Sequence, residues 1–197
     1  TGWIPIDGAN GNSYDPPAGL TGSRTYAVIV DPTGDPDCGP ATWATSCRKI
    51  TVFPLFNAGT LASGNETLCY NGDPAAIDFS QIPTGGNGTF NYQWYYLDGI
   101  VACPSGTDNT GWNIINGATS SSYDPPSGLT GSRTYAVMVD VTGTPDCGIF
   151  TWASGCRQVN VYQNVISGTV ALGDEAICYN GDPAEISFSV TPSGGAG

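Results

Sequence analysis

An internal repeat constrains this chain more than any other feature of its sequence. Residues 69–75 (CYNGDPA) recur as residues 178–184, 109 positions later, and the same offset carries residues 20–26 (LTGSRTY) onto 129–135. Aligned without a gap, residues 1–88 and 110–197 are identical at 54 of 88 positions. Identity at this level over a fixed period is the signature of tandem copies of one structural unit.

The period also divides the chain into one complete repeat and two parts. Residues 59–167 form a complete repeat, residues 1–58 the C-terminal part of the preceding repeat, and residues 168–197 the N-terminal part of the next. Residues 89–109 occur once. A partial repeat leaves an open apolar face and unpaired strand edges, so we expect neither part to be stable without something that covers it. We interpret the chain as a window on a longer array, or as a subunit whose ends are completed by neighbouring chains.

Apolar and aromatic residues at every second position predict β-strands. In residues 90–96 the aromatic side chains Phe90, Tyr92, Trp94 and Tyr96 lie on one side of such a strand. No segment has the i, i+3, i+4 apolar spacing that a helix of ordinary length needs. We expect strands near residues 60–69, 75–82, 89–97, 112–116, 121–124, 133–141 and 150–162. Short strands separated by Asn, Gly, Asp and Pro turns, with Trp94 on the third, predict an all-β fold of tandem immunoglobulin-like or fibronectin-III-like β-sandwich repeats.

The seven cysteines follow the same period, four to a repeat. The complete repeat contains Cys69, Cys103, Cys147 and Cys156. The partial repeats contain Cys38, Cys47 and Cys178, which are copies of its third, fourth and first cysteine, in that order. The chain has no histidine, and the spacings fit neither a zinc site nor a redox motif. We therefore expect structural disulfides and an extracellular location. Four cysteines allow three connectivities, and the spacing alone does not choose among them.

Several motifs in a fixed order resemble a known family. They are residues 177–183 (ICYNGDP), 92–94 (YQW), 112–119 (WNIINGAT), 122–125 (SYDP) and 146–148 (DCG). Over the whole repeat the sequence resembles the tandem Ig-like, or PKD-like, repeats of large Bacteroidota cell-surface proteins, including gliding-motility adhesins that are exported by the type IX route. The resemblance implies an extracellular or cell-surface location and a repeat architecture, and supplies no ligand.

The resemblance also favours one disulfide pairing. Simpler family members have two cysteines, which match Cys69 and Cys147, and the extra pair here is then Cys103 with Cys156. The rival pairing joins Cys147 to Cys156 and Cys69 to Cys103.

Two groups of polar residues have alternative interpretations. The acidic segment 31–37 (DPTGDPD) could form a calcium loop, but its copy 140–146 (DVTGTPD) lacks the middle acid, and Asp-Pro and Gly-Asp pairs are ordinary turn residues. We favour turns, and we expect no cofactor. Asn65 and Asn87 begin Asn-x-Thr sequons and are candidate glycosylation sites.

The tryptophans outside the expected core are candidate contact residues. Trp112 and Trp152, with their copies Trp3 and Trp43, lie beside glycine and serine near strand starts. Packing against neighbouring strands or domains is the simpler interpretation. Stacking on sugar rings, or docking another subunit, is the alternative, because amphipathic aromatic side chains dominate interfaces.

The charge balance excludes several classes of function. Seventeen acidic and five basic residues give a net charge of −12, which opposes binding to nucleic acids and to anionic membranes. The apolar runs are too short to insert into a bilayer, and without histidine there is no Ser-His-Asp triad. We therefore expect no enzyme but a structural repeat of an extracellular filament or adhesin stalk, associating with copies of itself. The alternative is a carbohydrate- or surface-binding adhesin module that uses exposed aromatic residues.

Overall fold

The structure, a computed structural model, describes residues 2–32, 39–62 and 64–196. Asp35 and Asp37 of the acidic 31–37 segment, and Cys38, lie outside these ranges. The described residues form sixteen β-strands and no helix, so the chain is all-β. It divides into two compact units, Thr1–Pro54 and Leu55–Gly197. Within the second unit, residues 55–162 build a closed core, and we call them the complete domain.

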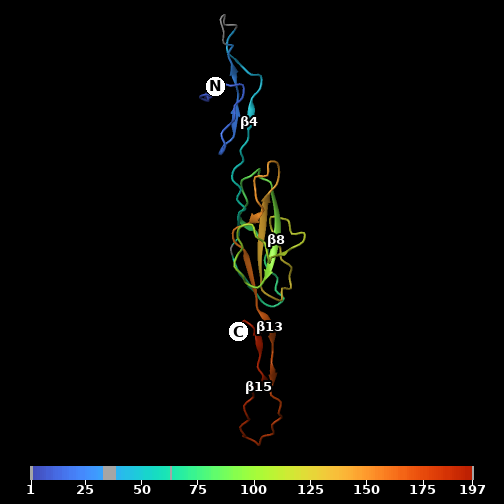
Figure 1. Ribbon diagram of the computed structural model, residues 1–197. Coiled ribbons are helices and arrows are strands. Elements are labelled where there is room, and N and C mark those ends of the chain that lie inside the picture. Colours follow the sequence, from blue (N-terminus) through green and yellow to red (C-terminus); the bar gives the residue numbers. More distant parts are fainter. Residues whose placement is uncertain (1, 33–38, 63, 197) are drawn as a thin grey trace. The chain divides into compact units, whose positions relative to one another are not determined.

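One large sheet forms most of the complete domain (Figure 1). Its strands, in spatial order, are β6 (Glu66–Leu68), β12 (Arg157–Val161), β10 (Arg133–Val141), β8 (Phe90–Asp98) and β9 (Asn113–Ile114), with β11 (Thr151–Trp152) also paired to β10. The antiparallel β8–β10 pair is continuous over nine residues, with Val137 opposite Trp94. The two strands predicted with the clearest period-two alternation therefore lie at the centre of the sheet.

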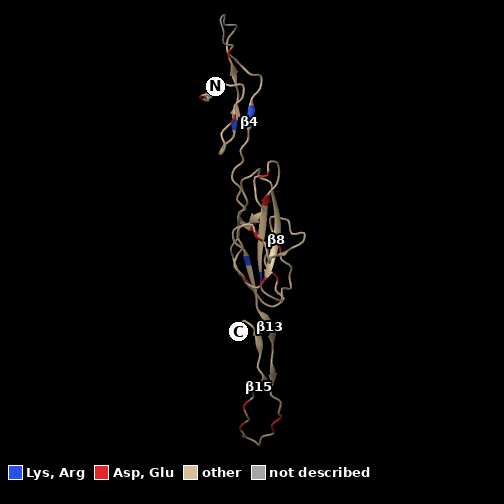
Figure 2. Ribbon diagram, viewed as in Figure 1, with Lys and Arg blue, Asp and Glu red and all other residues tan. Residues whose placement is uncertain are grey.

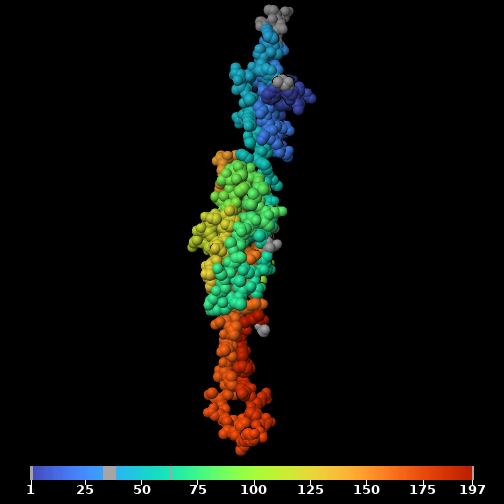
Figure 3. All heavy atoms as spheres, turned by 180° about the vertical axis from the view of Figure 1, so that it is seen from behind, coloured from blue at the N-terminus to red at the C-terminus, as the bar shows by residue number. Residues whose placement is uncertain are grey.

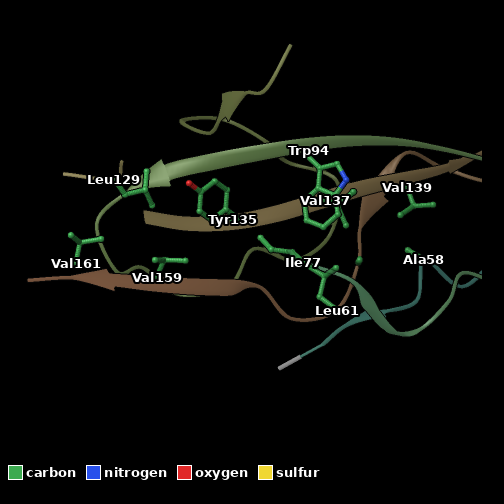
Figure 4. Close-up of a cluster of buried hydrophobic side chains, with 11 residues drawn as sticks. Ala58, Leu61, Ile77, Trp94, Leu129, Tyr135, Val137, Val139, Val159 and Val161 are labelled. Atoms are coloured by element: carbon green, nitrogen blue, oxygen red, sulfur yellow. The ribbon is translucent and has the colours of Figure 1, made fainter. Parts of the chain in front are cut away.

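A smaller layer covers one face of this sheet. It contains β5 (Thr60–Leu61) paired with β7 (Phe79–Gln81), and a bridge between Ile77 and Tyr123. The side chains between the layers, shown in Figure 4, form a core in which Trp94 is fully buried; the buried members are Ala58, Leu61, Ile77, Trp94, Leu129, Tyr135, Val137, Val139, Ala153, Val159 and Val161. The prediction that Trp94 is a core residue is confirmed.

Strand β10 is buried on both of its faces. Tyr135, Val137 and Val139 point into the core between the layers, whereas Ala136 and Met138 belong to a second cluster on the opposite face of the sheet. Successive side chains of a strand point to opposite faces. Because β10 has few polar positions, both faces of the sheet at this strand must be covered by other parts of the domain.

Two of the expected strands are interrupted. The strand expected at 60–69 consists of β5, which pairs with β7, and β6, which pairs in parallel with β12, so its halves join different layers. The strand expected at 150–162 consists of β11 and β12, because Ser154 between them exchanges hydrogen bonds with Gly59 and Leu61 of the smaller layer.

The next partial repeat pairs its strands as the complete domain does. β13 (Gln163–Ile166) pairs with β16 (Ser193–Gly195), and β14 (Thr169–Val170) pairs with β15 (Phe188–Val190). The Val170–Phe188 pair is the copy of Leu61–Phe79. Its apolar side chains are nevertheless uncovered: Ile186 is 84% exposed, whereas the equivalent Ile77 is 2% exposed. In Figure 3 the chain between β14 and β15 encloses an open ring.

The first unit also keeps the pairing of its copy. β1 (Arg24–Tyr26) pairs with β4 (Arg48–Ile50), and β2 (Ile29–Val30) pairs with β3 (Thr42–Trp43). These pairs correspond to β10–β12 and β10–β11 of the complete domain. Local strand pairing is therefore a property of each segment, whereas burial of the core needs the whole repeat.

Candidate functional site

A loop clamped by a disulfide covers the second face of the large sheet. The bond joins Cys103, in the loop after β8, to Cys156, which directly precedes β12, with 5.2 Å between the Cα atoms. Two further hydrogen bonds fix the loop on the N-terminal side of Cys103. Thr134 Oγ1 donates to the Gly99 carbonyl at 2.9 Å, and Gln158 Nε2 donates to the Val101 carbonyl at 2.7 Å. The loop is therefore part of the folded domain.

Under this loop lies an aromatic cluster, which we call the tryptophan cluster: Tyr95, Trp112 and Trp152. The Trp152 ring centroid lies 5.1 Å from that of Tyr95 and 5.2 Å from that of Trp112. Trp152 Nε1 donates a hydrogen bond of 2.8 Å to the Asp108 carbonyl, and its backbone N–H donates to the Gly106 carbonyl. The polar atom of the indole is thus paired within the loop.

Trp112 and Trp152 pack inside the complete domain, as the simpler of the two interpretations expects. Trp152 is only 5% exposed and Trp112 is half-buried, and the loop that precedes Trp112 accepts two hydrogen bonds from Trp152 at Gly106 and Asp108. Trp3 and Trp43 make the same contact in the first unit, with 5.6 Å between ring centroids, yet they are 47% and 51% exposed. The counterpart of residues 89–109 is not among the 197 residues.

The disulfide settles part of the predicted pairing. The predicted Cys103–Cys156 bond is present, and the rival pairing through Cys147–Cys156 is therefore wrong. Cys69 and Cys147, expected to bond to each other, are both free and exposed, as are Cys47 and Cys178. Cys38 lies outside the described residues.

Topology explains why Cys69 and Cys147 do not pair within one domain. Cys69 follows β6, which lies beside the C-terminal part of β12 and so near the start of β10. Cys147 lies in the loop after the end of β10. The nine residues of β10 span about 27 Å, and the Cα atoms of a disulfide lie within about 7 Å.

A half-buried ion pair, which sequence reasoning missed, connects β6 to β12. Arg157 Nη2 lies 3.0 Å from Glu66 Oε2, with the two side chains 17% and 20% exposed. Glu66 also accepts the backbone N–H of Ala75 at 3.1 Å. Glu175, its copy, accepts the N–H of Ala184 in the same way. The retention of a scarce glutamate in both copies was the signal that could have revealed this contact.

The remaining basic residue of the complete domain is also paired. Arg133 Nε lies 3.0 Å from Asp98 Oδ1, and its guanidinium lies over the Tyr96 ring. Figure 2 shows how sparse charged residues are along this part of the chain. With both arginines next to acids, the domain offers no basic patch among its described residues.

The predicted polar sites have ordinary local roles. Asp146 Oδ1 accepts the backbone N–H of Gly148, which is a turn contact. Within residues 2–32, 39–62 and 64–196, no three Asp, Glu, Cys or His side chains gather in a group that could hold a metal ion. Asn65 is exposed and donates to Gln158, whereas the Asn87 side-chain amide donates to the Thr142 carbonyl and is half-buried. A glycan on Asn87 would replace one of that amide's hydrogens.

Burial perturbs the tyrosines of the core. Burial raises the pKa of Tyr135 above its usual value and outweighs the opposing effect of Arg133. Burial likewise raises the pKa of Tyr123 and of Tyr92. Hydrogen bonds from Thr110 lower the pKa of the exposed Asp108. Three of the shifted groups are thus phenols that stay neutral near pH 7, and such groups serve packing more readily than proton transfer.

These features define an all-β repeat domain with a disulfide-clamped second cluster. The chain belongs to the family described as Domain of unknown function (DUF8696), whose model matches residues 57–162, more than half of the sequence. No curated protein and no solved structure matches the chain. The described residues contain no helix long and apolar enough to span a membrane.

Proposed function

We propose that the chain is a stretch of a tandem array of immunoglobulin-like domains, serving as a structural repeat in an extracellular filament or adhesin stalk. One observation carries the proposal: the same strand registers and local contacts recur 109 residues apart, yet only the complete copy closes its core. A chain built in this way gains stability from whole repeats placed in series.

The arrangement of layers supports the immunoglobulin-like assignment. Trp94 on the long strand β8 packs in the core, and the segment that contains β5 and β6 passes from one layer to the other. Tyr135 near the start of β10 and Leu129 in the turn before it are both buried in the core between the layers.

The oxidised bond supports an extracellular location. Disulfides persist in oxidising compartments, and Cys103–Cys156 closes a loop of 53 residues over the tryptophan cluster. A net charge of −6 for each repeat, from eight acids and two arginines in residues 59–167, favours solubility in a long thread.

The proposal has no catalytic component. The tryptophan cluster has its indole hydrogen-bonded and covered, so no observation favours the carbohydrate-binding alternative over the structural role. The expected partners are copies of the same protein, because a repetitive surface with few charges suits association with itself.

The test is imaging of the native protein. Antibodies raised against the chain, applied to intact source cells, should label extended threads on the outer surface in electron micrographs. An antibody against a cytoplasmic protein is the matched control and should label only lysed cells. Labelling by both antibodies only after lysis would contradict the extracellular role, and compact single particles would contradict the array.

A further inference from the structure

Each repeat carries two cysteines that its own fold leaves unpaired. Cys69 and Cys147 are free and exposed in the complete domain, although the other two cysteines of the same domain form a disulfide. Each position is also cysteine in the partial repeat that contains its copy, as Cys178 for Cys69 and Cys38 for Cys147. Two exposed thiols kept in each repeat, beside an oxidised pair, point to partners outside the domain.

Cys69 lies at the end of the domain where the chain leaves it. The preceding Leu68 carbonyl accepts a hydrogen bond of 2.9 Å from the N–H of Tyr162, the last residue of the domain. The turn that follows is held in place by a hydrogen bond of 2.8 Å from the Asn71 N–H to the Leu129 carbonyl. Cys69 is therefore one residue from the junction with the next repeat.

Cys147 lies at the opposite end, where the chain enters the domain. Its neighbour Gly148 packs on Val141, since a Cβ added to Gly148 would lie 2.9 Å from the Val141 Cβ. Val141 also packs against Gly86, and it is paired with Phe90, whose ring contacts Phe56 at the start of the domain.

The start of the next repeat connects these two ends. Directly after Tyr162, Gln163 pairs with Gly195, the copy of Gly86. In a complete next repeat, the copy of Val141 would pack on Gly195 as Val141 packs on Gly86, and the copy of Gly148 would pack on that valine. This places the copy of Cys147 at the junction where Leu68 meets Tyr162. Cys69 and the copy of Cys147 also lie on the same side of their sheets, the β12 side of β10.

We propose that Cys69 of each repeat forms a disulfide with the copy of Cys147 in the repeat that follows. The inference rests on the tandem array proposed above and adds a covalent link between its consecutive members. The link forms by exchange with an oxidised disulfide donor, such as glutathione disulfide. The protein S–S bond forms as the donor S–S bond breaks, and the two electrons and two protons of the protein thiols convert the donor to two thiols.

The proposal accounts for every free cysteine that the structure describes. Cys69 and Cys178 would each form a disulfide with the third cysteine of the repeat that follows. Cys147 would form one with the first cysteine of the repeat that precedes it. Cys47, the copy of Cys156, needs the counterpart of Cys103. All of these partner positions lie outside the 197 residues. An array linked in this way would carry tension across each junction through the backbone and through a second covalent path.

The experiment extends the full chain at Gly197 by a copy of residues 89–167, which completes a second consecutive repeat. Cys38, Cys47, Cys147 and Cys178, whose partners remain absent, are replaced by serine. After refolding with a glutathione redox buffer, maleimide labelling should find no free thiol. Peptide mapping without reduction should find Cys69 joined to the copy of Cys147 in the same chain.

The Cys69→Ser variant of this chain is the matched control and should expose one thiol, on the copy of Cys147. Two labelled thiols in the parent, or a bond between Cys69 residues of separate chains, would overturn the proposal. Protease resistance separates this outcome from failure of the array. If both repeats resist proteolysis and contain their Cys103–Cys156 bonds while Cys69 stays free, only the inter-repeat link is wrong.

Discussion

The role of a side chain in this protein depends on whether its repeat is complete. Trp152 and Trp43 are copies of one residue and make the same contact with a second tryptophan. In the part of the chain that the structure describes, the Trp152 indole N–H bonds to a covering loop, and Trp152 is 5% exposed where Trp43 is 51% exposed. The chain therefore contains its own matched controls, because the same substitution can be made at covered and uncovered copies.

Trp152→Ala should lower the free energy of unfolding of the complete domain by about 3–5 kcal/mol, because it removes a large buried side chain and leaves the Asp108 carbonyl without the indole donor. Trp43→Ala should change it by less than about 0.5 kcal/mol, since its side chain is exposed. Denaturant titrations followed by circular dichroism measure both. Equal losses of unfolding free energy at the two positions would show that the covering loop does not determine how much the tryptophan contributes to stability.

The buried phenols predict a loss of stability in alkali. Since the pKa of Tyr135 is raised in the folded state, the folded protein binds the phenol proton more tightly than the unfolded chain does. The stabilisation is complete below the unfolded pKa of about 10 and is lost as the pH rises through the folded value. Unfolding titrations between about pH 8 and 11 should show this loss, and Tyr135→Phe should make it smaller. An unchanged slope in Tyr135→Phe would assign the effect to other groups.

At the scale of the strand, each element is positioned by specific contacts as well as by its alternation. The short β6 has only three residues, yet Glu66 bonds to Arg157 of β12 and to the Ala75 N–H. Such a strand, at the edge of the sheet, gains little from its own ladder and depends on these side-chain bonds.

Glu66→Gln should lower the free energy of unfolding by about 1–3 kcal/mol, because it removes a charge-assisted bond and leaves Arg157 half-buried without its partner. Glu175→Gln is the control, since Glu175 makes the backbone contact in a partial repeat and should leave this free energy unchanged. Chemical denaturation of the two variants in parallel gives the comparison. A loss of the same size in both would contradict a role specific to the ion pair.

The sequence predicts some of these elements well, for physical reasons. The alternation around Trp94 and Val137 predicts β8 and β10 closely, because long central strands carry their burial pattern in their own residues. The break between Leu61 and Glu66 could not be predicted, since alternation does not say which strand is the partner. The cover over Trp152 was missed because residues 99–109 occur once, so the repeat offers no comparison, and the loop has no periodic pattern.

At the scale of the whole molecule, the proposed tandem array makes the complete repeat the expected mechanical unit. The partial repeats keep strand pairs without closed cores, so the complete domain is the part of this chain that can resist unfolding cooperatively. Within it, Cys103 and Cys156 enclose about half of the repeat, including β9, β10 and β11. The bond divides the domain into residues that force can extend and residues that it cannot.

Pulling the full chain by its two ends should therefore give one main unfolding event whose length depends on the disulfide. With the bond intact, the 53-residue span from Cys103 to Cys156 stays closed. Reduction releases this span, which should lengthen the extension by about 190 Å at roughly 3.6 Å per residue. Optical-tweezer traces with and without reductant measure the difference. A Cys103→Ser/Cys156→Ser variant should show the longer step, or unfold at low force, under both conditions, because loss of the bond also removes about 4 kcal/mol of stabilisation. A step of the same length before and after reduction would mean that force does not pass through the enclosed strands, and the complete repeat would then not be the unit that bears tension.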